Sequence, residues 1–261
     1  MKISVIIPAL NEAEQIGACL ESVRRAGEPE IIVVDGGSTD ATVALAQPSA
    51  IIIASARGRA TQMNAGAAIA TGDVLLFLHA DSRVDASAFC AIEAACHDRD
   101  VAGGTFCLRF DDDHRLLRAY AWFTHLRPLL FHYGDQGIFV RREIFDALGG
   151  FAAMPLMEDV DFLRRLSKLG KRALCGCPVT TSARRFLEHG IVRQQLLNAA
   201  LVLLFRAGAP VAMLARCYAP FRSGKERLNR AGKRRIRVHH LFQMVRGHAT
   251  LDRERKQVNV L

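Results

Sequence analysis

The sequence predicts an α/β fold in which a mostly parallel sheet is flanked by helices, with a helical and basic extension at the C-terminus. Through the first hundred residues, short β-branched runs bounded by turn residues alternate with helical patterns, which is typical of βαβ units. The chain has 261 residues, 50% of them hydrophobic, enough to bury one sizeable core but too few for two full domains. We therefore expect one α/β domain.

The first elements follow one another at regular intervals. Each predicted strand is a short apolar run, and each predicted helix places apolar residues at helical spacing. We predict strands at Ile3–Ile7, Ile31–Val34, Ile51–Ala54 and Val74–Leu78, and helices at Glu12–Arg25, Thr39–Ala46, Ala60–Ala70 and Ala86–Cys96.

After Val101 the pattern becomes irregular, because Gly103-Gly104 and the segment Gly134–Gly137 are expected to interrupt strands. An aromatic-rich helix is expected across the sheet, followed by one more helix and two brief strands. We expect the α/β domain to cover residues 1–190 and the extension to cover residues 191–261. The later elements are predicted at Leu116–Leu130, Glu158–Leu169, Ala173–Cys177 and Thr180–Phe186.

The extension begins with a nearly continuous apolar stretch, Gln195–Ala215, which at about twenty residues is just long enough to cross a bilayer. Arg206 near its centre and Pro210 favour instead a bent helical pair, packed on the core or lying in a membrane interface. The tail that follows is basic: residues 216–256 hold thirteen Lys and Arg against three Asp and Glu, whereas the rest of the chain holds 22 against 23. We expect the tail to bind an anionic membrane surface in preference to nucleic acid.

The seven cysteines form no C-x-x-C pair and have no histidine at zinc-finger spacing, so we expect reduced thiols and no zinc site. Cys175-Gly176-Cys177 is expected to be part of a buried strand. The apolar run at the N-terminus is too short for a signal peptide. These features predict a cytoplasmic protein, peripheral on the inner face of the membrane where the tail binds.

Ligands bind beyond the carboxyl ends of the strands in an open parallel sheet, so the residues after each strand are the candidates for a site. The first strand is followed by Pro8-Ala9-Leu10-Asn11-Glu12, and the second by Asp35 and two glycines. Asp35 is expected to accept hydrogen bonds from a base or ribose, with turn formation as its structural alternative. Gly36 and Gly37 let the backbone approach a ligand, and capping of the next helix explains Asp40.

The third and fourth strands are followed by cations and by an acid. Arg57 and Arg59 precede a helix that carries Asn64, and two guanidiniums at a helix N-terminus suit a diphosphate, with a solvated surface pair as the alternative. Asp81 follows a strongly apolar strand, where an acid is costly unless it is paired or bound to a cation such as Mg²⁺ or Mn²⁺. His79 either assists there or is a hydrogen-bonded core histidine.

Three carboxylates, Glu158, Asp159 and Asp161, stand close together at the start of a predicted helix, after Gly149-Gly150-Phe151. The helix dipole favours acids at this position, but their number exceeds that need and suits a general base. Arg184-Arg185 further on either holds a phosphate or lies on the surface of a strand.

Taken together, these segments resemble the family 2 glycosyltransferases, which have the GT-A fold with a Rossmann-like sheet. The resemblance covers about residues 3–190. Two further segments, Gly134-Asp135-Gln136-Gly137 and Met157–Asp161, are similar to a bacterial subgroup associated with radical-SAM or selenium-domain genes. The segments that carry the family resemblance are Ile6–Glu12, Val33–Asp40, Arg57–Gly66, the strand ending at Asp81, Gly149-Gly150-Phe151 and Glu158-Asp159.

The resemblance implies transfer of a sugar, with inversion, from a UDP- or GDP-linked donor to an acceptor hydroxyl that the sequence does not identify. Asp159 is then the general base, beside Glu158 as second catalytic carboxylate, and Asp81 ligates Mg²⁺ or Mn²⁺. Glu158 and Gln136 shape the acceptor side. The residues assigned to the nucleotide are Pro8, Ala9, Asn11, Glu12, Asp35, Gly37, Arg57, Asn64, His79 and Ala80, and those assigned to the acceptor or a phosphate are Gln136, Arg184 and Arg185.

The sequence departs from the family pattern at two places. His79-Ala80-Asp81 stands where the family commonly has Asp-x-Asp, which leaves one firm carboxylate for a metal. Phe186 replaces the tryptophan of processive members, so single-sugar transfer is expected. The alternative is a non-catalytic module of the same fold that binds a nucleotide sugar or a polyanion. A sugar-nucleotide pyrophosphorylase would carry a glycine-rich, lysine-bearing loop after the first strand, and this sequence does not.

Overall fold

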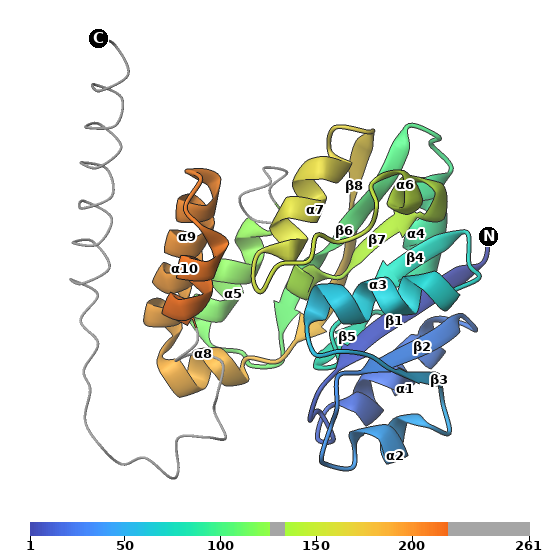
Figure 1. Ribbon diagram of the computed structural model, residues 1–261, viewed down its shortest axis with the longest axis horizontal. Coiled ribbons are helices and arrows are strands. Elements are labelled where there is room, and N and C mark those ends of the chain that lie inside the picture. The colour runs from blue at the N-terminus through green and yellow to red at the C-terminus, as the bar shows by residue number, and fades with distance from the viewer. Residues whose placement is uncertain (126–133, 219–261) are drawn as a thin grey trace. The chain divides into compact units, whose positions relative to one another are not determined.

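The computed structural model describes residues 1–125 and 134–218, and in this part of the chain eight strands form one sheet with helices on both faces (Figure 1). The strand order is β3-β2-β1-β4-β7-β6-β8-β5. The strands are β1 Ile3–Ala9, β2 Glu30–Asp35, β3 Ile51–Ala54, β4 Val74–Phe77, β5 Ser82–Val84, β6 Val101–Phe110, β7 Ile138–Arg141 and β8 Lys171–Thr181. The helices are α1 Ile16–Ala26, α2 Thr42–Ala46, α3 Arg59–Ile69, α4 Ala88–Cys96, α5 Arg115–Phe123, α6 Arg142–Ala147, α7 Glu158–Leu166, α8 Arg184–His189, α9 Ile191–Arg206 and α10 Val211–Tyr218, with a 3₁₀ turn, η2, at Gly134–Gln136.

The first half of the sheet is parallel, as predicted. Strands β3, β2, β1 and β4 are adjacent and run in the same direction. Every residue of β1 is buried, and strands covered on both faces read as continuous apolar runs rather than alternating ones. The four strands predicted in this half are confirmed to within two residues at each end. The helix predicted from Glu12 begins only at Ile16, after a turn, and the one predicted from Thr39 begins at Thr42.

The second half of the sheet is mixed. Strand β7 is antiparallel to both β4 and β6, whereas β6 and β8 are parallel. Because Ile138 pairs with Phe77, the start of β7 lies beside the carboxyl end of β4. The η2 turn that precedes β7 therefore lies at the same sheet edge as the loops after β1, β2 and β4.

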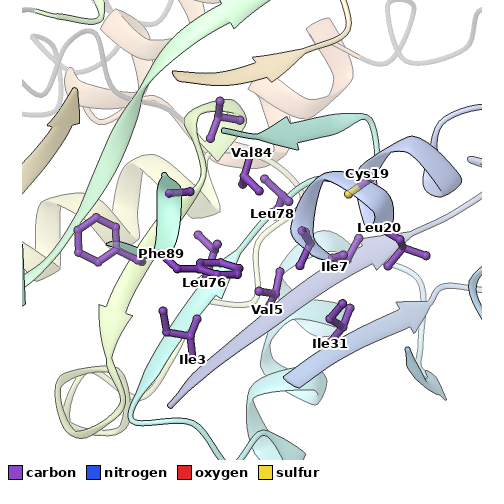
Figure 2. Close-up of a cluster of buried hydrophobic side chains, with 14 of the residues drawn as sticks. Ile3, Val5, Ile7, Cys19, Leu20, Ile31, Leu76, Leu78, Val84 and Phe89 are labelled. Carbon is purple, nitrogen blue, oxygen red and sulfur yellow. The ribbon is translucent and has the colours of Figure 1, made fainter. Parts of the chain in front are cut away.

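Two apolar clusters cover the two faces of the sheet. On one face, α1 and α4 pack on the odd-numbered residues of β1, including Ile3, Val5 and Ile7 (Figure 2). On the other face, residues of α3, α6 and α7 form a second cluster with Ile6 of β1, Val34 of β2 and Phe77 of β4. Alternating residues of the same strands thus supply both clusters.

The prediction that Gly103-Gly104 interrupts a strand is wrong, because β6 runs unbroken from Val101 to Phe110. A Cβ at Gly103 would meet the carbonyl oxygen of Phe139, and one at Gly104 would meet that of Ala173. These glycines admit the neighbouring backbones, which is a regular reason for glycine inside a strand.

The two brief strands predicted after Ala173 are also wrong. One strand, β8, runs from Lys171 to Thr181, because β6 offers it a parallel partner along its whole length, with an irregularity next to Cys175. The Cys175–Cys177 segment is part of a strand, as predicted, but of these three residues only Cys175 is buried. Pairing with β6 ends at Thr181, and Arg184–His189 forms the helix α8 instead of a strand.

The apolar stretch of the extension forms a bent helical pair, as predicted, since α9 ends at Arg206 and α10 begins at Val211. In the residues that the structure describes, no helix is long and apolar enough to cross a membrane. Both helices share an apolar cluster with Leu156 and Met157 at the start of α7. The aromatic-rich helix is α5, shorter than predicted. Residues 126–130 of its predicted range, and the basic tail from residue 219 onward, lie outside the described residues.

Candidate active site

A cavity lies where the ends of β4, β6 and β8 meet the helices that follow them. Its charged lining is balanced, with three carboxylates and three guanidiniums. Aromatic and amide side chains from β6, α5, α8, α9 and α10 complete the wall. The charged residues are Asp81, Asp135, Asp159, Arg59, Arg184 and Arg185, and the uncharged ones include Phe110, Tyr120, Phe186, Gln194, Asn198 and Tyr218.

An ion pair joins the end of β4 to the η2 turn: His79 Nδ1 lies 3.2 Å from Asp135 Oδ1. Burial disfavours the charged imidazolium, but the hydrogen bond with Asp135 and the charges of Asp135 and Asp81 outweigh it, so the pKa of His79 lies above its ordinary value. Burial likewise opposes ionisation of Asp135, yet its pKa is well below the usual range because of His79 and the charges of Arg185 and Arg59. The pair favours a protonated His79 beside an ionised Asp135.

A second ion pair joins the first residues of α3 and α7. Arg59 Nε lies 2.6 Å from Glu158 Oε1, and Glu158 is only 2% exposed. Burial lowers the pKa of Arg59, but Glu158, Asp159 and Asp135 together raise it above the usual value. Glu158 faces Arg59 and does not line the cavity. The structure thus gives Glu158 the place of a residue that positions Arg59, rather than that of a carboxylate facing a substrate.

Asp159 lines the cavity at the first turn of α7. Its Oδ1 accepts a hydrogen bond from the backbone N–H of Val160 at 2.8 Å. The preceding residue, Met157, is left-handed at φ 68°, a conformation that costs a non-glycine residue about 1 kcal/mol. This strained turn directs the start of α7 toward the cavity.

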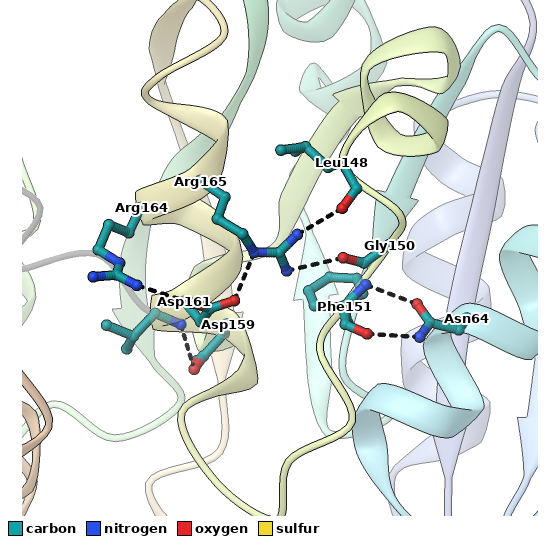
Figure 3. Close-up of polar contacts among 9 residues, drawn as sticks. Asn64, Leu148, Gly150, Phe151, Asp159, Asp161, Arg164 and Arg165 are labelled. Atoms are coloured by element: carbon teal, nitrogen blue, oxygen red, sulfur yellow. Dashed lines mark hydrogen bonds and ion pairs between the residues drawn. The ribbon is translucent and has the colours of Figure 1, made fainter. Parts of the chain in front are cut away.

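The third acid of the cluster, Asp161, points elsewhere. It forms ion pairs with Arg164 and with Arg165, whose Nε lies 2.6 Å from Asp161 Oδ2 (Figure 3). Arg165 also donates to the carbonyl oxygens of Leu148 and Gly150. The three carboxylates that the sequence groups together therefore have three different surroundings, and Asp159 alone of the three lines the cavity.

Asn64 was assigned to a diphosphate, but its amide binds the backbone of Phe151. Its Nδ2 donates to the Phe151 carbonyl at 2.8 Å, and its Oδ1 accepts from the Phe151 N–H at 2.9 Å (Figure 3). Together with Arg165, this side chain fixes the Gly149-Gly150-Phe151 loop. Asn64 therefore stabilises this loop and does not line the cavity.

Arg184 and Arg185 both line the cavity from α8. Arg185 Nη1 donates to the Tyr218 hydroxyl at 3.0 Å. Burial lowers the pKa of Arg185, but Tyr218, Asp135 and Asp81 raise it overall. Arg184 lies 3.7 Å from Glu12 Oε2 and 3.8 Å from Glu14 Oε2, so it links the cavity to the loop after β1.

The loops after β1 and β2 are bound to each other. Asn11, left-handed at φ 53°, accepts the Thr39 N–H at 2.8 Å, and its own N–H donates to Ser38 Oγ. The carboxylate of Asp35 accepts the N–H groups of Gly37 and Ser38, which is the turn role that the sequence left open. These hydrogen bonds hold the two loops as one unit beside the cavity, and neither Asn11 nor Asp35 lines it.

The remaining predicted residues are placed unequally. Arg57 is exposed and away from the cavity lining, whereas Arg59, two positions later, lies in it. Gln136 is fully buried, and its neighbour Asp135 lines the cavity instead. Pro8, Ala9 and Ala80 are buried at their strand ends, and Ala9 accepts hydrogen bonds from Gly36 and Gln62 through its carbonyl.

Sequence reasoning missed Asp135, Tyr218, Gln194 and Asn198 as cavity residues. Asp135 lies between Gly134 and Gly137, and the two glycines were the sequence feature that indicated a loop able to carry a site residue. Gln194 and Asn198 are two of the few polar residues in the apolar helix α9, four positions apart and so on one face. Gln194 is buried, with Nε2 donating to Asn198 Oδ1, while its own Oε1 has no protein partner.

The side chains around Asp81 show whether the site could bind the Mg²⁺ or Mn²⁺ that the family resemblance implies. In residues 1–125 and 134–218, no group of three or more His, Cys, Asp or Glu side chains is arranged to hold a metal ion. Asp81 lines the cavity, whereas His79 is paired with Asp135. One carboxylate suffices for Mg²⁺ where substrate phosphates and water supply the other ligands. The residues therefore fit a divalent ion that binds together with a diphosphate.

The sequence profile described as Glycosyl transferase family 2 matches residues 4–155, more than half of the chain. The chain is also 35% identical, over 164 residues, to PGL/p-HBAD biosynthesis glycosyltransferases of Mycobacterium tuberculosis and Mycobacterium bovis. That match covers 57% of this chain and 62% of each relative, so the chain spans less than two thirds of their length. None of these names refers to the radical-SAM or selenium-domain subgroup, and the comparisons support the family level only.

Three solved structures share the fold. Staphylococcus aureus TarS 1-349 has a TM-score of 0.60 at 15% identity, covering 94% of this chain and 78% of that one. Glucosyl-3-phosphoglycerate synthase from M. tuberculosis, in complex with Mn²⁺ and UDP, has a TM-score of 0.56 at 22% identity and covers 80% and 81%. The mannosyltransferase PcManGT from Pyrobaculum calidifontis, in complex with GDP-Man and Mn²⁺, has a TM-score of 0.56 at 22% identity and covers 83% and 69%. These likenesses confirm the predicted GT-A-like fold, and the profile match shows that the chain belongs to glycosyl transferase family 2.

Proposed function

We propose that the chain transfers a single sugar, with inversion, from a nucleotide diphosphate sugar to an acceptor hydroxyl. The observation that carries this proposal is the cavity shared by Asp81, Asp159, Arg59 and Arg185, four residues from distant parts of the chain. A carboxylate beside guanidiniums suits a reaction in which a proton leaves one partner while negative charge develops on a diphosphate.

In the proposed reaction, Asp159 accepts the proton of the acceptor hydroxyl as its oxygen forms a bond to the anomeric carbon. The bond from that carbon to the diphosphate oxygen breaks, and its electron pair leaves with the diphosphate. Arg59, Arg184 and Arg185 are placed to donate charge-assisted hydrogen bonds to the departing group. The loops after β1 and β2 would hold the base and ribose, next to the cavity that Arg184 links them to.

Asp81 would hold Mg²⁺ or Mn²⁺ against the diphosphate oxygens. When bound, the ion supplies positive charge that offsets the charge of the leaving diphosphate. The structural neighbours bear on the donor class, because they are complexes with UDP-GlcNAc, UDP-glucose or GDP-mannose. The UDP- or GDP-linked donor class, the subgroup within the family, the cytoplasmic location and the domain boundary at residue 190 stay predictions from the sequence.

The test uses Asp159→Asn, because asparagine can still accept the Val160 N–H. We expect donor hydrolysis, measured with a UDP- or GDP-linked sugar and Mn²⁺, to fall by about 10²- to 10⁴-fold, the usual contribution of a general base. Nucleotide affinity, measured by calorimetric titration, should change little. Asp146→Asn, an exposed carboxylate outside the cavity, is the matched control and should keep full activity.

Two results would contradict the proposal. A wild-type protein that binds no UDP- or GDP-linked sugar at millimolar concentration would remove the donor assignment. A protein that binds the donor tightly, but shows no turnover with any acceptor or with water, would be a non-catalytic binding module. His79, which stands where the family commonly has an aspartate, motivates this alternative.

A further inference from the structure

Helix α9 is apolar on two opposite faces. Gln194, Leu201 and Val202 are buried and line the cavity, and Leu201 and Val202 also belong to the apolar cluster shared with Leu156 and Met157. Val192 and Leu196, in contrast, are 57% and 66% exposed, and Leu203, 57% exposed, lies seven residues further along the same side. Positions separated by four and eleven residues fall on one line along a helix. An exposed row of large apolar side chains marks a surface that a partner can cover.

The neighbouring helix α5 also exposes apolar side chains. Trp122 is 60% exposed, and Leu116 and Phe123 lie on the helix with more than two fifths of their surface in solvent. Helices α5 and α9 contact each other, and Figure 1 shows them next to α8 and α10. We call this surface the α5–α9 face, made of Leu116, Trp122, Phe123, Val192, Leu196 and Leu203.

Cations outnumber acids on the helices at the α5–α9 face. Helices α5, α9 and α10 contain no Asp or Glu, while Arg193 and Arg206 are exposed at the two ends of α9. The 43 residues that follow α10 carry twelve Lys and Arg against three Asp and Glu. An apolar surface flanked by arginines, with an exposed tryptophan, complements a bilayer interface that contains anionic headgroups.

We propose that the α5–α9 face docks on the surface of an anionic lipid bilayer, with Trp122 and Leu196 entering the interface. A second copy of the chain is the other candidate occupant, but symmetric contact through this face would gather Arg193 and Arg206 of both copies around one apolar interface. The proposal is independent of the proposed function. The opposite face of α9 lines the cavity, so docking would bring the cavity within about one helix diameter, ~10 Å, of the headgroups.

The chain contains a single tryptophan, Trp122, whose fluorescence therefore reports this face alone. The full chain would be titrated with vesicles of phosphatidylcholine and phosphatidylglycerol at 3:1, and with vesicles of phosphatidylcholine only. We expect co-sedimentation with the anionic vesicles together with a blue shift of the tryptophan emission. Both signals should weaken strongly with the neutral vesicles and at high salt.

The deciding variant is Leu196→Glu, which changes an exposed side chain and should leave the thermal midpoint unchanged. We expect its affinity for anionic vesicles to fall at least tenfold, since an apolar contact is replaced by a charge of the same sign as the lipid. Leu45→Glu, at a comparably exposed position on α2, is the matched control and should bind as the wild type does.

Three results would overturn the proposal. Co-sedimentation with unchanged tryptophan emission would mean that the basic segment binds lipid without the α5–α9 face. Concentration-dependent dimers in analytical ultracentrifugation that Leu196→Glu abolishes, without a response to vesicles, would assign the face to a second copy. The absence of both vesicle binding and self-association would leave the face without the proposed role.

Discussion

The cavity depends on individual side chains whose places the charge pattern alone does not reveal. Glu158, Asp159 and Asp161 are almost adjacent in sequence, yet their carboxylates meet Arg59, the cavity and Arg165 respectively. The 100° step between successive helix residues separates them. The three acids at the start of α7 therefore have separate roles, and we expect a different effect from substituting each of them.

Replacing Arg59 with alanine should destabilise the protein by about 3 kcal/mol, because it leaves Glu158 buried without its partner. Urea unfolding at pH 7 measures this loss. Adding Glu158→Gln to Arg59→Ala should recover part of it, since a neutral amide costs less to bury than a charge. Arg57→Ala is the control, because Arg57 is exposed, and should change stability by less than about 0.5 kcal/mol. Equal losses for the two arginines would contradict the assignment.

Glu30 is a titrating group that contributes to stability at the amino end of β2, the end away from the cavity. Its carboxylate accepts hydrogen bonds from Ser4 Oγ and from the N–H and hydroxyl of Thr71. Burial raises the pKa of Glu30, but these hydrogen bonds and Lys2 lower it overall. A depressed pKa in the folded state stabilises the protein above the pKa of the unfolded state, near 4.3, and the gain is lost as the pH falls through the folded value.

Glu30→Gln should therefore cost about 1 kcal/mol of unfolding free energy at pH 7, and the gap to wild type should narrow below about pH 4. Urea unfolding from pH 7 to pH 3.5 follows both variants. Glu28→Gln, at an exposed neighbouring position, should track the wild type throughout. A gap that stays constant down to pH 3.5 would mean that the loss is steric rather than electrostatic.

At the scale of elements, Gly66 lets the backbone of helix α3 approach the side chains of the sheet closely. A Cβ at this position would lie 2.5 Å from Ile6 Cγ2 and 2.9 Å from Val34 Cγ2. Both partners are fully buried in strands β1 and β2, so neither has room to move. This close approach also sets the position of Arg59 at the start of the same helix.

Gly66→Ala should consequently destabilise the protein by roughly 1–3 kcal/mol, because the clash exceeds the gain of about 1 kcal/mol in helix propensity. Gly17→Ala in α1 is the matched control. No atom lies within 4 Å of its added Cβ, so the propensity gain should appear as a stabilisation of about 0.5–1 kcal/mol. Chemical denaturation of both variants measures the difference, and effects of the same sign would refute the packing argument.

For the whole molecule, ligand binding should appear as added stability. A nucleotide sugar at a hundred times its dissociation constant adds about 2.7 kcal/mol, which raises the melting temperature of a protein of this size by several degrees. We expect UDP- or GDP-linked sugars to do this, with a further increase on adding Mn²⁺. Asp81→Asn should remove the Mn²⁺-dependent part and keep the rest. An unchanged response to Mn²⁺ in this variant would place the ion elsewhere.

The sequence by itself determined the parallel half of the sheet, the bent helical pair and Asp81 as a polar group at the strand ends, while the family resemblance added Asp159, Arg184 and Arg185 to the site. Local periodicity and strand-end positions contain that information, since parallel strands end at one edge. Only the tertiary structure brought Asp135 to His79, because this needs β7 to run antiparallel beside β4. It also put Arg59 and not Arg57 in the cavity, because Arg57 lies in the loop before α3 and Arg59 begins the helix. Strand direction and helix phase are set by long-range packing, which no local pattern records.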